Sequence, residues 1–424
     1  MAAALSLALG VDLGSSGMRI ALVDQTGQRI AERACPYPHP FGDPRGWREG
    51  LIALCSRLEP QLRSQVGAIA IDGTSGTLLL CSSDGEPAAA PLHQALPYHQ
   101  TCPAQAGAAL AIAGQGPAAS ASGSLARALA LLETAAACAL RGPWLLRHQA
   151  DWLMGWLLGD WRWGEEGNNL RLGWDLQERC WRGAIGGQPW SGGLPDVRCS
   201  GEVLGSLQPS AAKMLGLPLA CRVVAGSTDA NAAVLAADPQ LRDGVAVLGT
   251  TLVLKQWSPR PIEGPGVSCH RLAGRWLVGG ASNAGAGVLR RFYNDAQLRE
   301  LSRQIDPRRS SGLQLRPLPG RGERFPVDDP SLEPVLEPRP VSDVRYLQGL
   351  LEGLARIEAA GWERLQALGA PALERVISVG GGAVNPQWRR IRAQQLGGLP
   401  VLNRPGLSAA LGMARLAATA LSRP

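Results

Sequence analysis

Residues 12–17 combine an acidic side chain with small and hydroxyl residues. They read Asp-Leu-Gly-Ser-Ser-Gly and follow the apolar run Leu5–Val11. Glycines let backbone N–H groups approach a phosphate closely, and the hydroxyls of Ser15 and Ser16 add further donors. A carboxylate such as Asp12 can hold Mg²⁺, usually through water. A hairpin turn with a solvated aspartate would give the same pattern, so both interpretations stay open here.

A second aspartate stands in a similar setting. Residues 226–229 read Gly-Ser-Thr-Asp, between a short apolar run and an alanine-rich stretch. A carboxylate at Asp229, delivered by a strand to the start of a helix, is well placed to take a proton from a hydroxyl that attacks phosphorus. The alternative is that Asp229 only caps the helix that begins near Ala230.

Two further loops consist of small residues that could approach a nucleotide. Gly249, Thr250 and Thr251 join two predicted strands, where they could contact a terminal phosphate or simply form a tight turn. The glycines Gly380–Gly382, with Asn385 nearby, lie between a predicted strand and a predicted helix. Such a loop could lie flat under a base and ribose, near a helix N-terminus.

The elements around these loops predict an α/β protein. The chain opens as a β-meander, and hydrophobic spacing and turn residues define the later elements. Each half delivers one of the two aspartates from a strand, which predicts two related α/β domains facing a cleft. Residues 305–340, rich in Pro, Arg and Gly, predict an irregular excursion. The predicted strands are 5–11, 18–23, 28–34, 66–71, 78–82, 222–225, 244–248, 252–257 and 375–379, and the helices 47–63, 124–140, 144–158, 230–237, 346–368, one from 387, and 408–421.

Composition excludes several classes of function. The chain has 424 residues and a net charge of +7, but Lys213 and Lys255 are its only lysines and its arginines are scattered. No nucleic-acid partner is therefore expected, and neither lysine belongs to a P-loop. Nine cysteines without a C-x-x-C pair favour a reducing, cytoplasmic compartment. The absence of a run of 18 apolar residues predicts no membrane partner.

The order of the motifs carries more information than any one of them. An Asp loop, an Asp-Gly-Thr-Ser loop, a second Asp loop, Gly-Thr-Thr and Gly-Gly-Gly follow one another over nearly the whole chain. This order resembles the FGGY-type carbohydrate kinases of the actin and sugar-kinase superfamily. The resemblance is closest to the D-ribulose kinases of cyanobacteria and plants, also called xylulokinase-like. It rests further on residues 69–77, 149–153, 249–255, 279–283 and 321–326.

The resemblance implies a fold and an activity. It implies two actin-like, ribonuclease H-like domains, 1–221 for the sugar and 222–424 for ATP, flanking a deep cleft. The implied reaction is ATP-dependent phosphorylation of a ketopentose, most closely D-ribulose to D-ribulose 5-phosphate, with ATP and Mg²⁺ as cofactors. D-xylulose kinase is the near alternative, and a non-catalytic nucleotide- or sugar-binding protein of the same fold is the more distant one. A monomer or homodimer in the cytoplasm is expected.

The resemblance also implies roles for single residues. Asp229 matches the catalytic base, and Ser75 matches a serine that contacts the sugar together with Asp12 and Asp229. The remaining matches concern the phosphates, the metal and the adenosine: Asp12, Ser15 and Ser16 for the transferred phosphoryl group and Mg²⁺; Gly249, Thr250 and Thr251 for a second phosphate loop; Gly380, Gly381 and Asn385 for the adenosine side.

One departure from the family pattern narrows the range of expected substrates. Larger members often carry a Trp-x-Asp-x-Arg segment that grips a polyol. The corresponding residues Tyr98–Cys102 contain neither an acid nor a strong base. Glycerol and similar substrates therefore lose support.

Overall fold

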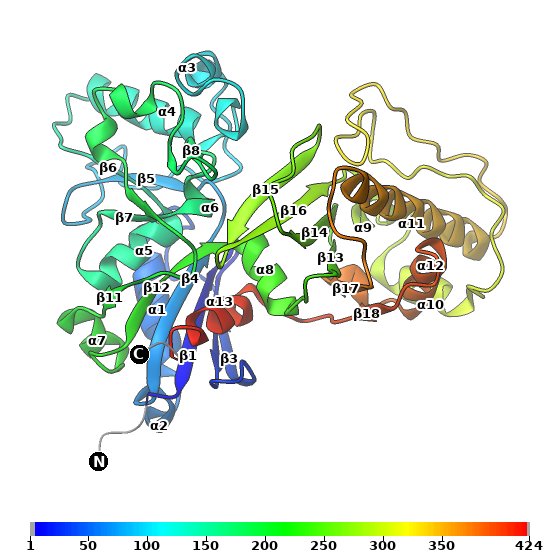
Figure 1. Cartoon of the computed structure of the whole chain (residues 1–424), viewed down its shortest axis with the longest axis horizontal. Helices are drawn as coiled ribbons and strands as arrows, with labels where there is room; N and C mark the ends of the chain where they lie inside the picture. The colour runs from blue at the N-terminus through cyan, green and yellow to red at the C-terminus, as the bar shows by residue number, and fades with distance from the viewer. Residues whose placement is uncertain (1–4, 422–424) are drawn as a thin grey trace. The chain divides into compact units, whose positions relative to one another are not determined.

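The computed structural model describes residues 5–421. These described residues form two compact units (Figure 1). The first unit comprises the chain up to residue 236, residues 271–274 and the segment from residue 408 onwards; the second comprises residues 237–270 and 275–407.

The first unit is built on a six-stranded sheet with the order β11-β12-β4-β1-β2-β3. The opening strands β1, β2 and β3 pair antiparallel, which confirms the predicted meander. Strands β1, β4 and β12 run parallel, so their carboxyl ends lie at the same edge of the sheet. The strands are β1 (Leu7–Leu13), β2 (Met18–Val23), β3 (Arg29–Cys35), β4 (Val66–Gly73), β11 (Val203–Ser206) and β12 (Arg222–Thr228).

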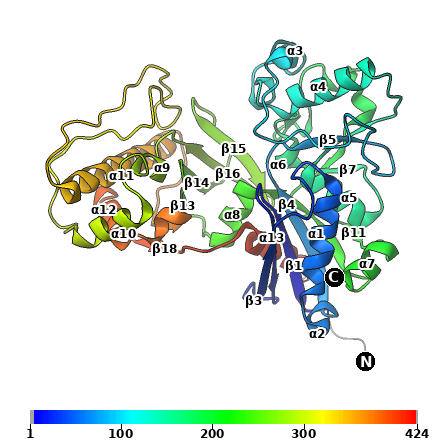
Figure 2. The same cartoon turned by 180° about the vertical axis from the view of Figure 1, so that it is seen from behind.

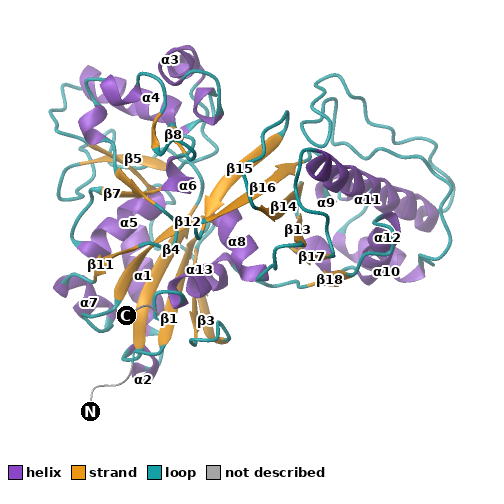
Figure 3. Ribbon diagram, viewed as in Figure 1, coloured by secondary structure: helices purple, strands orange, loops and turns teal. Residues whose placement is uncertain are grey.

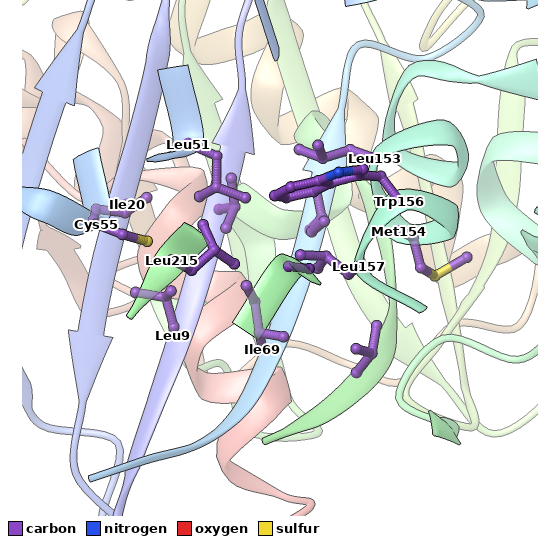
Figure 4. Packing of buried hydrophobic residues seen from close by; sticks show 14 of the residues in the cluster. Leu9, Ile20, Leu51, Cys55, Ile69, Leu153, Met154, Trp156, Leu157 and Leu215 are labelled. Atoms are coloured by element: carbon purple, nitrogen blue, oxygen red, sulfur yellow. The ribbon is translucent and has the colours of Figure 1, made fainter. Parts of the chain in front are cut away.

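Helices cover both faces of this sheet. Leu9 and Ile69 of the sheet pack with residues of α1 (Pro44–Ser56), α5 (Gln149–Leu158) and α7 (Pro209–Leu215) in one apolar core (Figure 4). Successive strand residues face opposite ways, so Gly10 faces away from Leu9. There α13 (Ala409–Ala418) lies so close that a Cβ on Gly10 would be 2.0 Å from the carbonyl oxygen of Ala410 (Figure 2).

A second, smaller core in the first unit lies around β5 (Leu78–Cys81) and β6 (Leu145–His148), with α3 (Pro103–Ala113) and α4 (Ser124–Ala137). The predicted helix 144–158 is wrong in its first turn. Leu145–His148 pairs with β5 as a strand, and the helix begins at Gln149. The short elements of this unit are α2 (Pro60–Arg63), η1 (Pro117–Ala119), β7 (Trp163–Glu165), α6 (Glu166–Asn169), β8 (Trp174–Asp175), β9 (Cys180–Trp181), η2 (Ile185–Gly187), η3 (Ser191–Gly193) and β10 (Asp196–Arg198).

The second unit is built on a sheet with the order β15-β16-β14-β13-β17-β18. The long helix α11 (Asp343–Ala367) packs against it and against α10 (Asp295–Gln304) and α12 (Pro386–Gln395). Residues 306–342 contain no helix and only isolated bridges, as predicted (Figure 3). The remaining elements of this unit are β13 (Asp243–Leu248), β14 (Leu252–Ser258), β15 (Val267–Leu272), β16 (Arg275–Ala281), α9 (Ala286–Leu289), β17 (Arg375–Val379), η4 (Gly381–Val384) and β18 (Val401–Asn403). Helix α8 (Asp229–Ala237) belongs to the first unit except for its last residue.

The bounds of the two units differ from the predicted domains 1–221 and 222–424. Strand β12 belongs to the first unit because it pairs with β4, and α13 belongs there because it packs on β1. The chain thus returns to its first unit for its last helix. No helix within residues 5–421 is both long and apolar enough to cross a membrane.

Candidate active site

Three aspartates meet at the carboxyl edge of the first unit's sheet. Asp12 near the end of β1 is the register partner of Asp72 near the end of β4. Thr228, the last residue of β12, is paired with Gly73, and Asp229 follows it directly. The prediction that Asp12 and Asp229 come from opposite domains is wrong, since both belong to the first unit. Their delivery by strands to one site follows from the parallel pairing.

Asp72 is the most buried of the three aspartates. Its side chain is fully buried, and no N–H or hydroxyl group donates to either of its carboxyl oxygens. Burial raises the pKa of Asp72 well above its usual range, and the charges of Asp12 and Asp229 raise it further. Of the three aspartates, Asp72 is therefore the one whose surroundings most favour the protonated form.

Asp12 is the partner that can carry the charge of this pair. Burial raises the pKa of Asp12 above its usual value, and the hydrogen bond from Asp72 acts in the opposite direction. The loop that follows presents Ser15 and Ser16 to solvent. A carboxylate beside two accessible hydroxyls suits a hard cation and a phosphoryl group.

The surroundings of Asp229 bear on its predicted role as a general base. Burial raises its pKa to about 6, with a smaller contribution in the same direction from the charge of Asp12. The helix α8 begins at Asp229 itself, and the carboxyl Oδ1 accepts the N–H of the adjacent Ala230 at 2.7 Å. A capping side chain would instead accept the N–H two or three residues further on. The geometry therefore does not fit the capping role, and the role of Asp229 as a base stays a prediction.

A hydrogen-bonded bridge connects the two loops at this edge. Gln149 Oε1 accepts the backbone N–H of Thr74 at 3.2 Å and its hydroxyl at 2.9 Å. Gln149 Nε2 donates to the Tyr37 hydroxyl at 3.3 Å, and that hydroxyl donates to the carbonyl oxygen of Gly14 at 2.8 Å. We call this the Gln149–Tyr37 bridge. It fixes the loop that carries Ser75 relative to the loop that carries Ser15 and Ser16.

The sequence singled out neither Asp72 nor the members of this bridge as site residues. The sequence does contain a pattern that could have identified Asp72, because this residue opens the Asp-Gly-Thr-Ser loop after a buried strand. The pattern for Gln149 is weaker, since this residue only begins the stretch 149–153 that supports the family resemblance. No sequence pattern could have identified Tyr37, because its contacts with Gly14 and Gln149 arise only in the folded chain.

Ser75 is half-buried between β4 and β5, and its predicted contact with a sugar stays a prediction. The buried side chain of Arg127 organises the surroundings of this loop. It donates to the carbonyl oxygens of Gly76 at 3.1 Å and Gln100 at 3.0 Å, and also to that of Tyr98. The segment that replaces Trp-x-Asp-x-Arg is thus tied to the Ser75 loop through its backbone.

The second unit contains a cavity of about 700 Å³. Four residues predicted for the nucleotide line it: Gly249, Thr250, Gly381 and Asn385. Thr251 and Gly380 lie beside these residues in the sequence but outside the lining. The other lining residues are Leu248, Ala286, Gly287, Leu289, Arg290, Asp295, Leu298, Arg299, Ser302, Arg303, Leu347, Leu351, Gly382, Val384, Pro386, Gln387 and Trp388.

Asn385 holds the wall of this cavity together. It caps α12 by accepting the Trp388 N–H at 3.0 Å and donates to the Ser302 hydroxyl of α10 at 2.9 Å. Gly380 has φ +86°, a conformation that glycine adopts most readily. These two residues therefore shape the loop between β17 and α12, whereas Gly381 is exposed.

The C-terminal part of the chain matches a known family model. Residues 244–421 match the C-terminal domain of the FGGY family of carbohydrate kinases. Solved structures similar to this chain include a xyloylose kinase from Brucella ovis (21% identity, TM-score 0.82) and a xylulose kinase from Rhodospirillum rubrum (21%, 0.79). A third is the glycerol kinase of Plasmodium falciparum with ADP (14%, 0.78). Each comparison covers 98% of this chain and 90% of the other.

The fold is that of the FGGY sugar kinases. This confirms the predicted α/β fold. The FGGY match includes Gly249, Thr250, Gly381 and Asn385, so the cavity lies in the part of the chain that matches the family. Asp12, Asp72 and Asp229 lie outside the matched residues. Their roles depend on the geometry described above.

Proposed function

We propose that this protein is a carbohydrate kinase that transfers the γ-phosphoryl group of ATP to a ketopentose. The observation that carries the proposal is the edge of the first sheet, where Asp12 and Asp229 come from the strands on either side of Asp72 and the pKa of Asp229 is about 6. The likeness of the fold to sugar kinases over 98% of the chain supports the same reaction.

D-ribulose is our first substrate, and its product would be D-ribulose 5-phosphate. The support for D-ribulose is the resemblance of residues 69–77, 249–255 and 321–326 to D-ribulose kinases. D-xylulose is the second candidate, and it is favoured by two similar solved structures that are xylulose kinases. Both sugars present a primary hydroxyl to the same base, so the chemistry of the site does not distinguish them.

In this mechanism Asp229 accepts the proton of the attacking hydroxyl. General-base catalysis of this kind contributes about 10²–10⁴-fold to the rate. A pKa of about 6 leaves Asp229 mostly ionised near neutral pH while keeping it a stronger base than an exposed aspartate. Ser75, Asp12 and Asp229 would contact the sugar, and the Gln149–Tyr37 bridge would hold the Ser75 loop in place.

Ser15 and Ser16 would donate to the phosphoryl group as negative charge develops on its oxygens. Mg²⁺, when bound, would neutralise the phosphates, with Asp12 as its protein ligand through water. Within residues 5–421, no group of three or more acidic, His or Cys side chains could hold a metal ion. Water and phosphate oxygens would therefore supply most of its ligands, as they usually do for Mg²⁺.

The nucleotide would bind to the second unit. Gly249, Thr250 and Thr251 would face its terminal phosphates, and Gly380, Gly381 and Asn385 would face its adenosine. Transfer to a sugar on the first unit then requires water to be kept away from both substrates, as in other kinases.

The test is ADP release from ATP with a panel of ketopentoses, ketohexoses and polyols, for the wild type and for Asp229→Ala. We expect D-ribulose or D-xylulose to stimulate ADP release, and Asp229→Ala to abolish the stimulation while ADP still binds. A non-catalytic binding protein would show no stimulation by any sugar, and that result would contradict the proposal. Near-normal turnover of Asp229→Ala would show that another group is the base.

A further inference from the structure

The buried carboxylate of Glu323 lies in the irregular segment between α10 and α11, outside the cavity. Glu323 is 4% exposed, and its Oε2 accepts the Ser282 hydroxyl at 2.5 Å. Its Oε1 accepts the backbone N–H groups of Asn283 at 2.7 Å and Arg324 at 2.9 Å. A buried carboxylate is stable only when such donors replace water. Its contacts therefore hold residues 282 and 283 tightly.

The segments around residues 282 and 322 are fastened to each other at three more points. Asn283 Nδ2 donates to the carbonyl oxygen of Gly322 at 3.0 Å. Arg324 Nε donates to the carbonyl oxygen of Ala281 at 2.7 Å. A Cβ on Gly280 would be 2.3 Å from the ring of Phe325, so the ring lies directly on the strand. These contacts join stretches 279–283 and 321–326, both of which the sequence singled out.

The loop that Glu323 holds continues into the nucleotide cavity. Ala284, whose N–H donates to the Ser282 hydroxyl at 2.9 Å, accepts the N–H of Leu252 at 2.7 Å. Two residues further on, the Ala286 N–H donates to the carbonyl oxygen of Gly249 at 2.9 Å. The Gly287 N–H donates to that of Thr250 at 3.2 Å.

These contacts leave loop 282–287 little room to move. A Cβ on Gly285 would be 2.4 Å from the carbonyl oxygen of Thr250. Loop 282–287 therefore cannot move toward the β13–β14 turn without displacing Thr250. Gly249, Thr250, Ala286 and Gly287 all line the cavity.

We propose that Glu323 is a positioning residue for nucleotide binding: through loop 282–287 it fixes Gly249 and Thr250 in the arrangement that holds the phosphates of ATP. This inference rests on the proposed function, because it takes the cavity to be the nucleotide site. It adds a residue that does not contact the nucleotide and that belongs to the irregular segment.

The test measures the affinities for ADP and for the sugar separately, by calorimetry on the full chain. For Glu323→Ala we expect the Kd for ADP to rise about tenfold or more, with the Kd for the sugar unchanged, because the sugar loops belong to the first unit. Glu323→Gln keeps an oxygen for the N–H groups of Asn283 and Arg324, and it is expected to stay within about threefold of the wild type. Glu333→Ala is the control, an exposed residue of the same segment paired with Arg321 at 3.3 Å.

If Glu323→Ala fails to fold, Ser282→Ala replaces it. That variant loses one donor to Glu323 and the acceptor for Ala284, so a smaller rise in the Kd for ADP is expected. An unchanged Kd for ADP in these variants would overturn the inference while leaving the kinase proposal intact. An equal loss of ADP and sugar affinity would overturn it as well, because a general structural role would then explain the loss. No ADP binding by the wild type would contradict the kinase proposal itself.

Discussion

Asp12 and Asp72 are direct register partners on the adjacent parallel strands β1 and β4. Two neighbouring carboxyl groups do not readily both ionise, because their charges repel and burial disfavours each charged form. Burial raises the pKa of the fully buried Asp72 well above its usual range, so this carboxyl group favours the protonated form. Asp12 is then the group of this pair better able to carry a negative charge, and it precedes the loop of the exposed Ser15 and Ser16.

The first prediction concerns the stability cost of Asp72. Its pKa is raised in the folded state, so above about pH 4 the unfolded chain loses this proton more readily and stability falls as the pH rises. Asp72→Asn keeps the size and shape of the side chain and cannot ionise. We therefore expect Asp72→Asn to raise the Tm relative to wild type, and the gain to be larger at pH 8 than at pH 4.

Thermal unfolding at both pH values measures this difference. For a chain of this size, each kcal/mol added to the free energy of unfolding raises the Tm by about 2–4 °C or less. Asp84→Asn, in an exposed turn, is the matched control and should show no such pH-dependent gain. A gain in Tm that is the same at both pH values would mean that Asp72 is already ionised in the folded protein.

The second prediction is the pH dependence of catalysis. Because burial raises the pKa of Asp229 to about 6 and only the ionised form accepts a proton, kcat/KM should be flat above about pH 7. Below pH 6 it should fall about tenfold for each pH unit. Initial rates between pH 5 and pH 8.5 measure the profile, and ADP binding over the same range separates loss of the base from loss of nucleotide. Full activity at pH 5 with ADP binding intact would exclude Asp229 as the base.

The third prediction tests the Gln149–Tyr37 bridge. Tyr37→Phe removes the hydroxyl that links Gln149 to Gly14, and one such hydrogen bond contributes about 0.5–1.5 kcal/mol. We expect the loops carrying Ser75 and Ser15 to lose their fixed relation, so that kcat falls about three- to tenfold. Steady-state kinetics and the Tm together measure the effect.

Tyr346→Phe is the control for this substitution. It also removes a hydroxyl that donates to a carbonyl oxygen, that of Leu336 at 2.9 Å, but in the second unit. It should lower the Tm to a similar extent and leave kcat unchanged. Equal losses of kcat in the two variants would show that Tyr37 acts only through stability.

The sequence predicted the parts of this site that depend on local patterns. Asp12 and Asp229 were identified because each follows an apolar strand and precedes small residues, and the glycine loops because they separate strands from helices. What it missed depends on strand order. That β12 joins the sheet beside β4, which brings Asp229 to Asp12 and Asp72, follows from pairings between residues more than 140 positions apart in the chain. Local spacing carries no information on these pairings.

The first turn of the predicted helix 144–158 shows the same limit at smaller scale. Leu145 and Leu146 are both apolar, so the hydrophobic period of a helix and that of a strand fit them equally well. Pairing of Leu145–His148 with β5 satisfies the strand hydrogen bonds of both segments, and the tertiary contact decides the outcome. The prediction failed where two segments 60 to 70 residues apart had to be considered together.

The fourth prediction compares neighbouring glycines of the loop between β17 and α12. Gly380 has φ +86°, and a Cβ there would be 3.0 Å from the carbonyl oxygen of Leu248. Gly380→Ala should therefore cost about 1–3 kcal/mol of stability.

Gly381 lines the cavity, and a Cβ there would have no neighbour within 4 Å. Gly381→Ala should leave the Tm near that of the wild type but raise the Kd for ADP, because the added methyl group occupies space that the adenosine needs. Thermal unfolding and calorimetric titration with ADP separate the two effects. Unchanged ADP affinity of a stable Gly381→Ala variant would mean that the nucleotide does not bind against this glycine, and the adenosine would have to be placed elsewhere in the cavity.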